Sequence, residues 1–237
     1  MDTSFYTARR GVMATQERLN VISNNIANVN TTAYKAQDSK FSDLMYYNIR
    51  ATEPEVTRLK AGTGVVQDRT DIDFRPNLIV PTGSKYDYAI KGDIGFFRLQ
   101  DPQTGEISYT RNGHLSMSQR ADGMYLVTDA GKFMLDANGQ PLRVVDGDAT
   151  ALPAVYTFEN TNGMLAQGSN EYVPIAKNGP AAISPGATVE RGYLEDGNVD
   201  LADEMAKTVE TSRAYSYTLK MVTTSYEVED TINNLRK

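Results

Sequence analysis

The chain has 237 residues, of which 40% are hydrophobic and 23% are charged, and these proportions are typical of a globular protein. The net charge of −6 argues against nucleic acid as a partner, and no stretch approaches the roughly 20 apolar residues that cross a bilayer. The chain has no cysteine, which excludes disulfides and thiolate metal sites, and its single histidine, His114, cannot form a histidine-based metal cluster.

The first predicted element is a helix from Ser4 to Asn28, which contains no proline and one glycine. Heptad-like spacing is typical of a helix that packs against another helix. The apolar residues that recur every seven positions are Phe5, Val12, Leu19 and Ile26, and Ile22 and Val29 add the complementary offset.

Four asparagines crowd the end of this helix, in the stretch NNIANVNTTAYK at 24–35. Asparagine is roughly 0.6 kcal/mol worse than alanine as a helix former, so the cluster needs a reason. Amides both donate and accept hydrogen bonds, and in a helix packed among neighbours they would bond across interfaces and disfavour wrong registers. Alternatively, Asn28 and Asn30 only end the helix and turn the chain. Tyr34 follows as an aromatic anchor.

The middle of the chain is predicted to be a β domain. Turn signals such as RNG, ADG and DANG separate short runs of strand-forming residues, and this spacing is typical of an antiparallel sandwich or barrel. The segment 51–83 before them is predicted to be a linker or an extended segment. The expected strands are 86–91, 95–100, 106–110, 114–119, 124–128, 132–135 and 141–145, with weaker candidates at 154–158 and 172–176.

A second long helix is predicted from Leu201 to Lys237, where proline and glycine are both absent. Asp200 is its expected N-cap, and Asp203 and Glu204 place negative charge in the first turn, where it suits the helix dipole. After Tyr226 the apolar pattern shifts phase. Its stripe before that shift steps by four and three through Leu201, Met205, Thr208, Ser212, Tyr215, Leu219, Val222 and Tyr226.

The sequence therefore predicts an α+β protein whose long terminal helices pair as a coiled-coil-like layer, with a central antiparallel all-β domain. We expect a discontinuous helical core of residues 1–50 and 195–237, the linker at 51–83, and the β domain at 84–194. The helices are expected to pair with each other or to pack on the β domain, because a helix that cannot bury its stripe is marginal alone.

No catalytic constellation stands above background. His114 lies at a turn-to-strand junction, and no G-x-S-x-G motif occurs. LDANGQP and EDGNVD look acidic, but neither has the ligand pattern of an EF-hand. We therefore expect no catalytic residue, no cofactor and no metal site.

Both ends of the chain resemble the bacterial flagellar axial proteins, the rod and hook family. The resemblance is carried by NNIANVNTTAYK, by GNVDLADEM and RAY in the C-terminal helix, and by YAIKGDIGFFRL and YTRNGHLSM in the middle. It covers roughly residues 1–50, 84–145 and 192–237, and it is closer to the rod group, especially the distal rod, than to the hook. Ala33 stands where the family usually has glycine, which disfavours a positive φ there, and Ser212 stands where it often has glutamine.

The resemblance implies a non-enzymatic structural subunit of the flagellar basal-body rod. Such chains are exported without a cleavable signal peptide, through the flagellar type III export apparatus, and the N-terminus here shows no apolar signal segment. They assemble with copies of themselves and with related axial proteins into a periplasmic helical tube, which encloses the export channel and transmits torque. The alternatives are a hook-type subunit and, in a different class, an exported β-domain cell-wall hydrolase or adhesin.

This implied assembly places the useful residues at contacts between subunits. The residues expected there lie on the terminal helices and just after the first one. They are Leu19, Ile22, Asn25, Ile26, Asn28, Val29, Tyr34, Leu201, Met205, Arg213, Tyr215, Leu219, Val222 and Tyr226.

Overall fold

The computed structural model describes residues 3–48 and 60–235, and the chain divides into two compact units. The helical unit comprises Met1–Ala27, Gln37–Asp71 and Asp200–Lys237. The β unit comprises Asn28–Ala36 and Ile72–Val199. The predicted α+β class, with a helix at each end and an antiparallel β domain between them, is confirmed.

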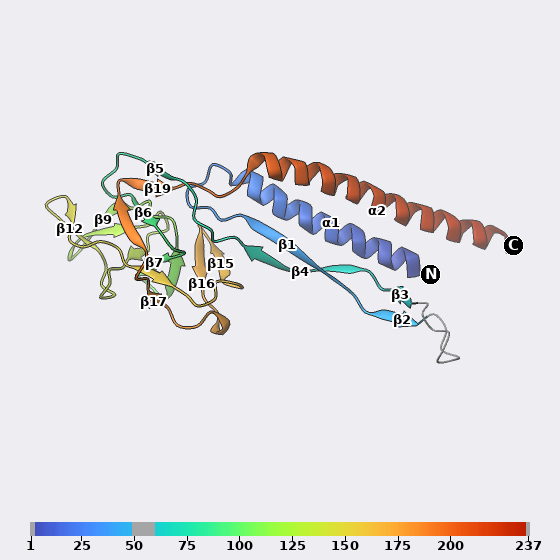
Figure 1. Ribbon diagram of the computed structural model, residues 1–237, viewed down its shortest axis with the longest axis horizontal. Helices are drawn as coiled ribbons and strands as arrows, with labels where there is room; N and C mark the ends of the chain where they lie inside the picture. Colours follow the sequence, from blue (N-terminus) through green and yellow to red (C-terminus); the bar gives the residue numbers. More distant parts are fainter. Residues whose placement is uncertain (1–2, 49–59, 236–237) are drawn as a thin grey trace. The chain divides into compact units, whose positions relative to one another are not determined.

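Two long helices form the first layer of the helical unit (Figure 1). Helix α1 spans Thr3–Ala27 and helix α2 spans Leu201–Leu235, close to the predicted bounds, although Lys237 lies outside the described residues. Asp200 is the N-cap of α2, as predicted, because its Oδ1 accepts hydrogen bonds from the backbone amides of Ala202 at 2.9 Å and Asp203 at 3.2 Å.

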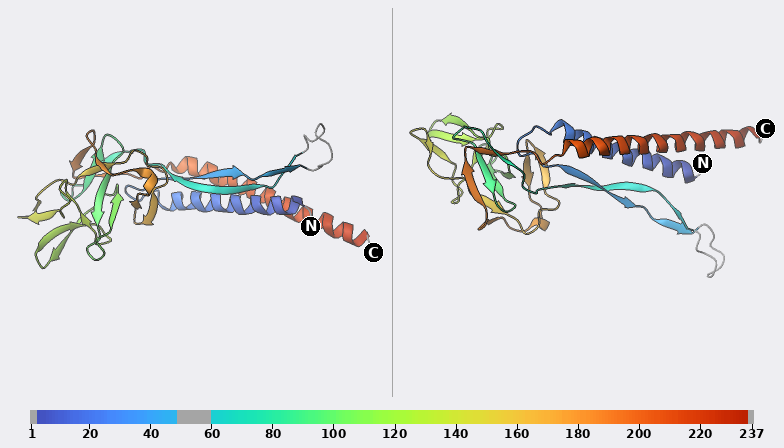
Figure 2. Two further views of the ribbon diagram at one scale, coloured as in Figure 1. Left: turned by 90° about the horizontal axis from the view of Figure 1, so that it is seen from below. Right: turned by 45° about the horizontal axis from the view of Figure 1, so that its top comes forward.

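A two-stranded ribbon lies beside α1 in the same unit (Figures 1 and 2). Where it is described, the predicted linker forms strands from residue 60 onward, whereas 51–59 lies outside the described residues. The pattern in VVQDRTDI gave no clean alternation, which is why this part was not predicted as a strand. The ribbon pairs β1 (Gln37–Asp43) with β4 (Val65–Ile72), and β2 (Tyr46–Asn48) with β3 (Lys60–Gly62).

The β unit is built on an 11-stranded, antiparallel sheet. Seven of the predicted strands correspond to β6–β12, and the two weaker candidates correspond to β14 and β16. The sheet contains β7 (Phe96–Gln100), β8 (Ile107–Thr110), β9 (Ser116–Arg120), β10 (Gly123–Val127), β11 (Phe133–Met134), β12 (Arg143–Val145), β13 (Asp148–Ala149), β14 (Val155–Thr157), β15 (Leu165–Gly168), β16 (Glu171–Val173) and β17 (Ala182–Ile183).

Two further strand pairs complete the β unit. The strand β18 (Thr188–Arg191) pairs with β6 (Tyr88–Lys91), and β19 (Tyr193–Glu195) pairs with β5 (Ile79–Pro81). A short 3₁₀ helix spans Ala176–Asn178. The returning strands β18 and β19 bring the chain back to the earlier strands of this unit just before α2 begins.

The core of the β unit consists of two apolar clusters that share strand β7. Successive side chains of a strand point to opposite faces, so Phe96 and Phe97 enter different clusters, and both are fully buried. The cluster around Phe96 is largely aromatic, with Phe74 at 5.0 Å and Phe158 at 6.0 Å between ring centroids. Among the described residues, no helix is both long and apolar enough to span a membrane.

Candidate assembly surfaces

The seam between α1 and α2 is small and polar. The Oγ atoms of Ser4 and Ser225 lie 2.7 Å apart, and Asn25 Nδ2 donates to Glu204 Oε2 at 3.2 Å near the other end. Between them, a β-carbon placed on Gly11 would lie 3.4 Å from Thr218 Cγ2. Each step of seven along α1 is thus matched by a step of seven back along α2, so the helices are antiparallel.

This seam lies one position away from the predicted apolar stripe of α1. The side chains of that stripe are only partly buried, at Phe5, Val12, Leu19 and Ile26. On α2 the predicted stripe divides. Thr208, Tyr215 and Val222 are partly buried beside the seam, whereas Leu201, Met205, Ser212, Leu219 and Tyr226 are exposed.

Asn25 joins three elements of the helical unit. Its Nδ2 donates to the carbonyl oxygen of Gln37 in β1 at 2.8 Å, and its Oδ1 accepts from the amide of Gln37 at 2.9 Å. The same Nδ2 reaches Glu204 on α2, whose Oε1 lies 2.8 Å from Lys207 Nζ. Hydrogen bonds to Asp203 and Glu204 raise the pKa of Lys207. Because Asn25 is only 1% exposed within a single chain, its amide already serves contacts inside that chain.

Exposed apolar side chains lie along the length of α2 on both flanks of the seam, and together they are called its exposed apolar row. Burial of such groups normally supplies the driving force for folding, so a helix that exposes many of them is unusual. Because Ser4 meets Ser225, the last turns of α2 run past the described start of α1 (Figure 1). The exposed residues are Leu201, Met205, Val209, Tyr217, Leu219, Met221, Tyr226, Val228, Ile232 and Leu235.

The predicted interface residues fall into three groups by exposure. Leu201, Met205, Arg213, Leu219 and Tyr226 are exposed. The partly buried residues are Leu19, Ile26, Asn28, Val29, Tyr215 and Val222, and the buried ones are Ile22, Asn25 and Tyr34. The helical unit holds all of them except Asn28, Val29 and Tyr34, which belong to the β unit.

The segment after α1 is an integral part of the β unit. Ala33 and Tyr34 are buried, and Ala33 adopts a φ of 56°. The expectation that alanine disfavours a positive φ here was wrong. The backbone amide of Ala33 donates to the carbonyl oxygen of Glu195 at 2.9 Å, and this contact holds the residue in the left-handed region.

The side chain of Asn198 links three segments of the chain by hydrogen bonds at one edge of the β unit. Its Oδ1 accepts from the amide of Ala36 at 2.7 Å, and its Nδ2 donates to the carbonyl oxygen of Asp73 at 2.8 Å. The amide of Asp73 in turn donates to the carbonyl oxygen of Ala36 at 2.9 Å. These segments are the ones through which the chain passes between the two units, so a single side chain sets their spacing.

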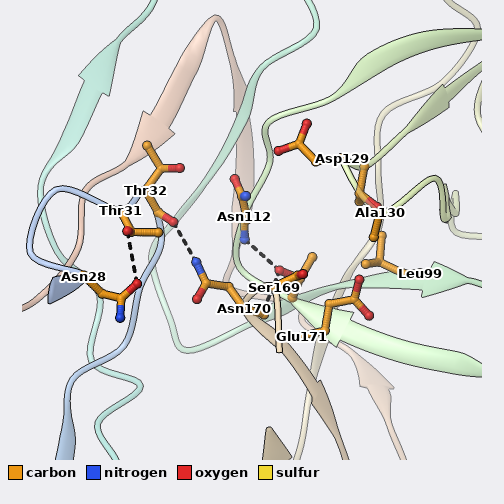
Figure 3. A pocket seen from close by; sticks show the side chains of 12 residues that line it. Asn28, Thr31, Thr32, Leu99, Asn112, Asp129, Ala130, Ser169, Asn170 and Glu171 are labelled. Atoms are coloured by element: carbon orange, nitrogen blue, oxygen red, sulfur yellow. Dashed lines mark hydrogen bonds between the residues drawn. The ribbon is translucent and has the colours of Figure 1, made fainter. Parts of the chain in front are cut away.

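A polar pocket of about 320 Å³ adjoins the segment that follows α1 (Figure 3). Asn170 Nδ2 donates to the carbonyl oxygen of Thr32 at 3.0 Å, so the β15–β16 turn holds the loop after α1. Thr31 Oγ1 donates to Asn28 Oδ1 at 3.3 Å, and the amide of Thr31 donates to the carbonyl oxygen of Asn28 at 2.9 Å. At Asn28 the turn-forming explanation of the asparagine cluster is therefore realised.

The comparisons with known proteins cover both ends and the middle of the chain. Residues 5–35 match the family model for "Flagella basal body rod protein", residues 190–235 match "Flagellar basal body rod FlgEFG protein C-terminal", and residues 89–154 match "Flagellar hook protein FlgE/F/G D1 domain". The flagellar basal-body rod protein FlgG of Buchnera aphidicola subsp. Acyrthosiphon pisum (strain APS) is 30% identical over 99% of this chain and 100% of the relative. The chain belongs to the flagellar basal-body rod protein family.

Other rod proteins also match over at least nine-tenths of the chain. FlgG of Bacillus subtilis (strain 168) is 29% identical over 99% of each chain, and FlgF of Rhizobium meliloti (strain 1021) is 28% identical over 91% of this chain and 90% of the relative. This rod protein is thus a structural subunit of the flagellar basal body and is similar to FlgG, the distal-rod type. The predicted family and structural role are confirmed.

Sequence reasoning missed the contacts of several polar residues in the rod protein. Glu204 was predicted only to place charge in the first turn of its helix, and Thr211 and Asn198 were not singled out, because polar residues at seam and edge positions carry no periodic apolar signal. A signal was present for Glu204, because it stands on α2 in the same heptad position as Thr211 and Thr218. A heptad of small or polar residues is a weaker indicator of helix packing than a heptad of leucines.

Proposed function

We propose that the helical unit packs against the helical units of other copies, and of related axial proteins, to form the wall of a helical tube that encloses the export channel. The observation that supports this proposal is the exposed apolar row of α2. Full burial of a leucine-sized side chain contributes about 1.5–3 kcal/mol, so covering several of these residues at each contact would drive assembly.

The predicted interface residues have different parts in this proposal. Leu201, Met205, Leu219 and Tyr226 make direct apolar contacts, and Arg213 adds a charged one. Asn25 acts indirectly, because its amide holds α1, β1 and α2 of its own chain in register. Tyr34 and Asn28 act through the β unit, where they fix the loop that follows α1.

The route to the tube is also part of the proposal. The chain is exported by the flagellar type III apparatus as an extended chain, and it reaches the periplasmic rod. A helical unit with little apolar burial of its own is compatible with such threading, because its helices are marginal without neighbours. The assembled tube then transmits torque between its axial neighbours.

Electron microscopy of purified protein under assembly conditions tests the proposal with two matched variants. Leu219→Gln combined with Tyr226→Gln removes two exposed apolar contacts, and Lys220→Gln changes a neighbouring exposed residue in the same helix. We expect straight rods from the wild type and Lys220→Gln, and monomers with an intact β unit from the double variant. Rods of normal abundance from the double variant would refute the assembly surface, and curved tubes from the wild type would indicate a hook-type subunit.

Removal of 219–237 is a stronger form of the same test. The truncated chain should lose assembly while the near-ultraviolet circular dichroism of the β unit persists, because the β unit has a separate core. If the truncated protein still formed rods, the terminal helix would not be an assembly element. If the signal of the β unit vanished, α2 would instead be part of that core.

A further inference from the structure

The β unit contains a fully buried cluster of three charged side chains that comes from distant parts of the sequence. Lys35 Nζ lies 2.8 Å from Glu195 Oε1, and Arg111 Nε lies 2.7 Å from Glu195 Oε2. The side chains of both cations are 0% exposed, and that of Glu195 is 1% exposed. Lys35 follows α1, Arg111 follows β8, and Glu195 ends β19 just before α2.

The side chain and the backbone carbonyl of Glu195 both accept hydrogen bonds. Besides the two cations, its Oε1 accepts a hydrogen bond from the amide of Asn77 at 2.9 Å, and its backbone carbonyl accepts from Ala33. Lys35 also donates to the carbonyl oxygen of Arg75 at 2.8 Å, and Arg111 Nη1 donates to that of Gly95 at 2.9 Å. One carboxylate therefore organises segments from both ends and from the middle of the unit.

The charges of the cluster do not balance. Two cations share one anion, and within residues 3–48 and 60–235 Glu195 is the one carboxylate that pairs with either of them. Arg111 Nη2 is buried without a hydrogen-bond partner among these residues, so the cluster has no spare acceptor. A buried cation that loses its partner is strongly destabilising, whereas apolar replacement of a whole buried group is often neutral or favourable.

We propose that Glu195 is a completion switch for the β unit: the unit closes only when the segments 28–36 and 193–199 are both in place, because until then Lys35 and Arg111 cannot be buried. A chain made from its N-terminus reaches Glu195 only after the rest of this unit has been made. The switch therefore delays closure until both ends are present. The consequence for assembly rests on the proposed function. A chain in which the segment 28–36 or the segment 193–199 is not in place presents no closed β unit to a growing rod.

Four full-length variants test the switch on dilute monomer, so its outcome does not depend on assembly. Glu195→Gln keeps the size of the side chain but removes its charge and replaces one of its two accepting oxygens with an NH2 donor. Glu190→Gln is the matched control, because Glu190 pairs with Lys91 at 2.7 Å on the surface of the same unit. The third variant is Lys35→Met, Arg111→Met and Glu195→Leu together, and the fourth is the single change Lys35→Met.

Denaturant unfolding and hydrogen exchange give the readouts. Glu195→Gln should lower the closing equilibrium of the β unit by roughly 100-fold or more, and Glu190→Gln by less than about 5-fold. The triple variant should recover the wild-type closing equilibrium. The closing equilibrium of Lys35→Met should lie between those of the wild type and Glu195→Gln, because Arg111 keeps its partner. Exchange protection in Glu195→Gln should be lost jointly over 28–36 and 193–199.

Three results would overturn the switch. If Glu195→Gln behaved like Glu190→Gln, the charge would not be required. If the triple variant were as open as Glu195→Gln, shape rather than charge would govern closure. If protection were lost only next to residue 195 while 28–36 stayed protected, the cluster would be a local contact and would not link the two ends.

Discussion

The two units of this rod protein bury different kinds of side chain. The β unit packs two clusters of aromatic and aliphatic residues around β7. Among its described residues, the helical unit buries only Ala14 and Ile22 as apolar side chains, and its other buried residues are Asn25, Glu204 and Thr211. Apolar burial is the main favourable term in folding, so the β unit has its own driving force and the helical unit has little of it.

The polar seam of the helical unit offers specificity in place of stability. The hydrogen bonds Ser4–Ser225 and Asn25–Glu204 are 2.7 and 3.2 Å long, and a slip of one turn would break both. Each such bond contributes only about 0.5–1.5 kcal/mol net. Ordering the backbone costs about 1–2 kcal/mol per residue, so the pair of helices needs further contacts to stay formed. The exposed apolar row of α2 is where such contacts would come from.

Hydrogen exchange on dilute monomer is the strongest test of this difference in stability between the two units. We expect amides of 3–27 and 200–235 to exchange at least roughly 1000-fold faster than those in the central strands of the β unit, since the helices lack apolar burial. The segment 28–36 should be protected with the β unit, because Ala33 and Lys35 are bonded inside it. Assembly into rods should slow exchange in both helices.

The comparison would fail on one clear outcome. Strong protection of α1 and α2 in a verified monomer would mean that the helical unit is stable by itself. The polar seam would then be sufficient without neighbours. Fast exchange over 28–36, with the rest of the β unit protected, would instead remove this segment from the folded core.

Alkaline pH should destabilise the β unit selectively. Burial raises the pKa of Tyr88, Tyr109 and Tyr172 in this unit. Above the ordinary tyrosine pKa of about 10 the unfolded chain loses protons that the folded chain keeps, so stability falls as pH rises. Each such group contributes up to about 1.4 kcal/mol per pH unit until its own raised pKa is reached.

Lys35 acts in the opposite sense over a lower range. Burial lowers its pKa from 10.5, so folding releases its proton only between the lowered pKa and about 10.5, and stability rises with pH in that window. Urea unfolding between pH 9 and 11.5 should therefore show a decline that begins above pH 10. Tyr172→Phe should remove about a third of the slope, and an unchanged slope would show that this hydroxyl does not retain its proton.

The sequence predicted the fold better than it predicted the contacts. Both helices and the strands β6–β12 could be found because turn signals and long runs without glycine or proline are local. The ribbon strand β4 could not, because VVQDRTDI does not alternate apolar and polar residues, although its half-buried and exposed positions alternate over the first four residues. Glu195 could not be paired with Lys35 either, since they are 160 residues apart and a lone charge carries no periodicity. Tertiary burial gives such residues their roles, and local patterns in the sequence do not reveal it.

Asn25→Ala should weaken rods more than monomers. Removing the amide leaves the backbone groups of Gln37 and the carboxylate of Glu204 without this partner, which costs about 1–3 kcal/mol in the folded helical unit. The critical concentration for assembly should rise by roughly 5- to 150-fold, while the melting temperature of the monomer, which reports the β unit, should barely move.

Asn24→Ala is the matched control for this change, because Asn24 is exposed and both substitutions improve helix propensity equally. Its critical concentration should stay near the wild-type value. Equal effects of the two substitutions would show that the junction of α1, β1 and α2 adds nothing to assembly. A marked loss of monomer stability in Asn25→Ala alone would instead show that the helical unit is already formed before assembly.

The smallest expected effect separates backbone strain from packing at Ala33. An alanine at a φ of 56° has a backbone strain of roughly 1–2 kcal/mol, which a glycine avoids. Glycine, however, lacks the buried methyl group and has more conformational freedom in the unfolded chain, and both effects lower stability. Ala130→Gly is the control, because Ala130 is exposed in the same unit and has no positive φ. We expect Ala33→Gly to leave the free energy of unfolding within about 1 kcal/mol of the wild type, on the stabilising side, and Ala130→Gly to lower it. A loss larger for Ala33→Gly than for Ala130→Gly, measured by urea unfolding at pH 7, would show that the buried methyl outweighs the strain and that alanine is the better residue at this turn.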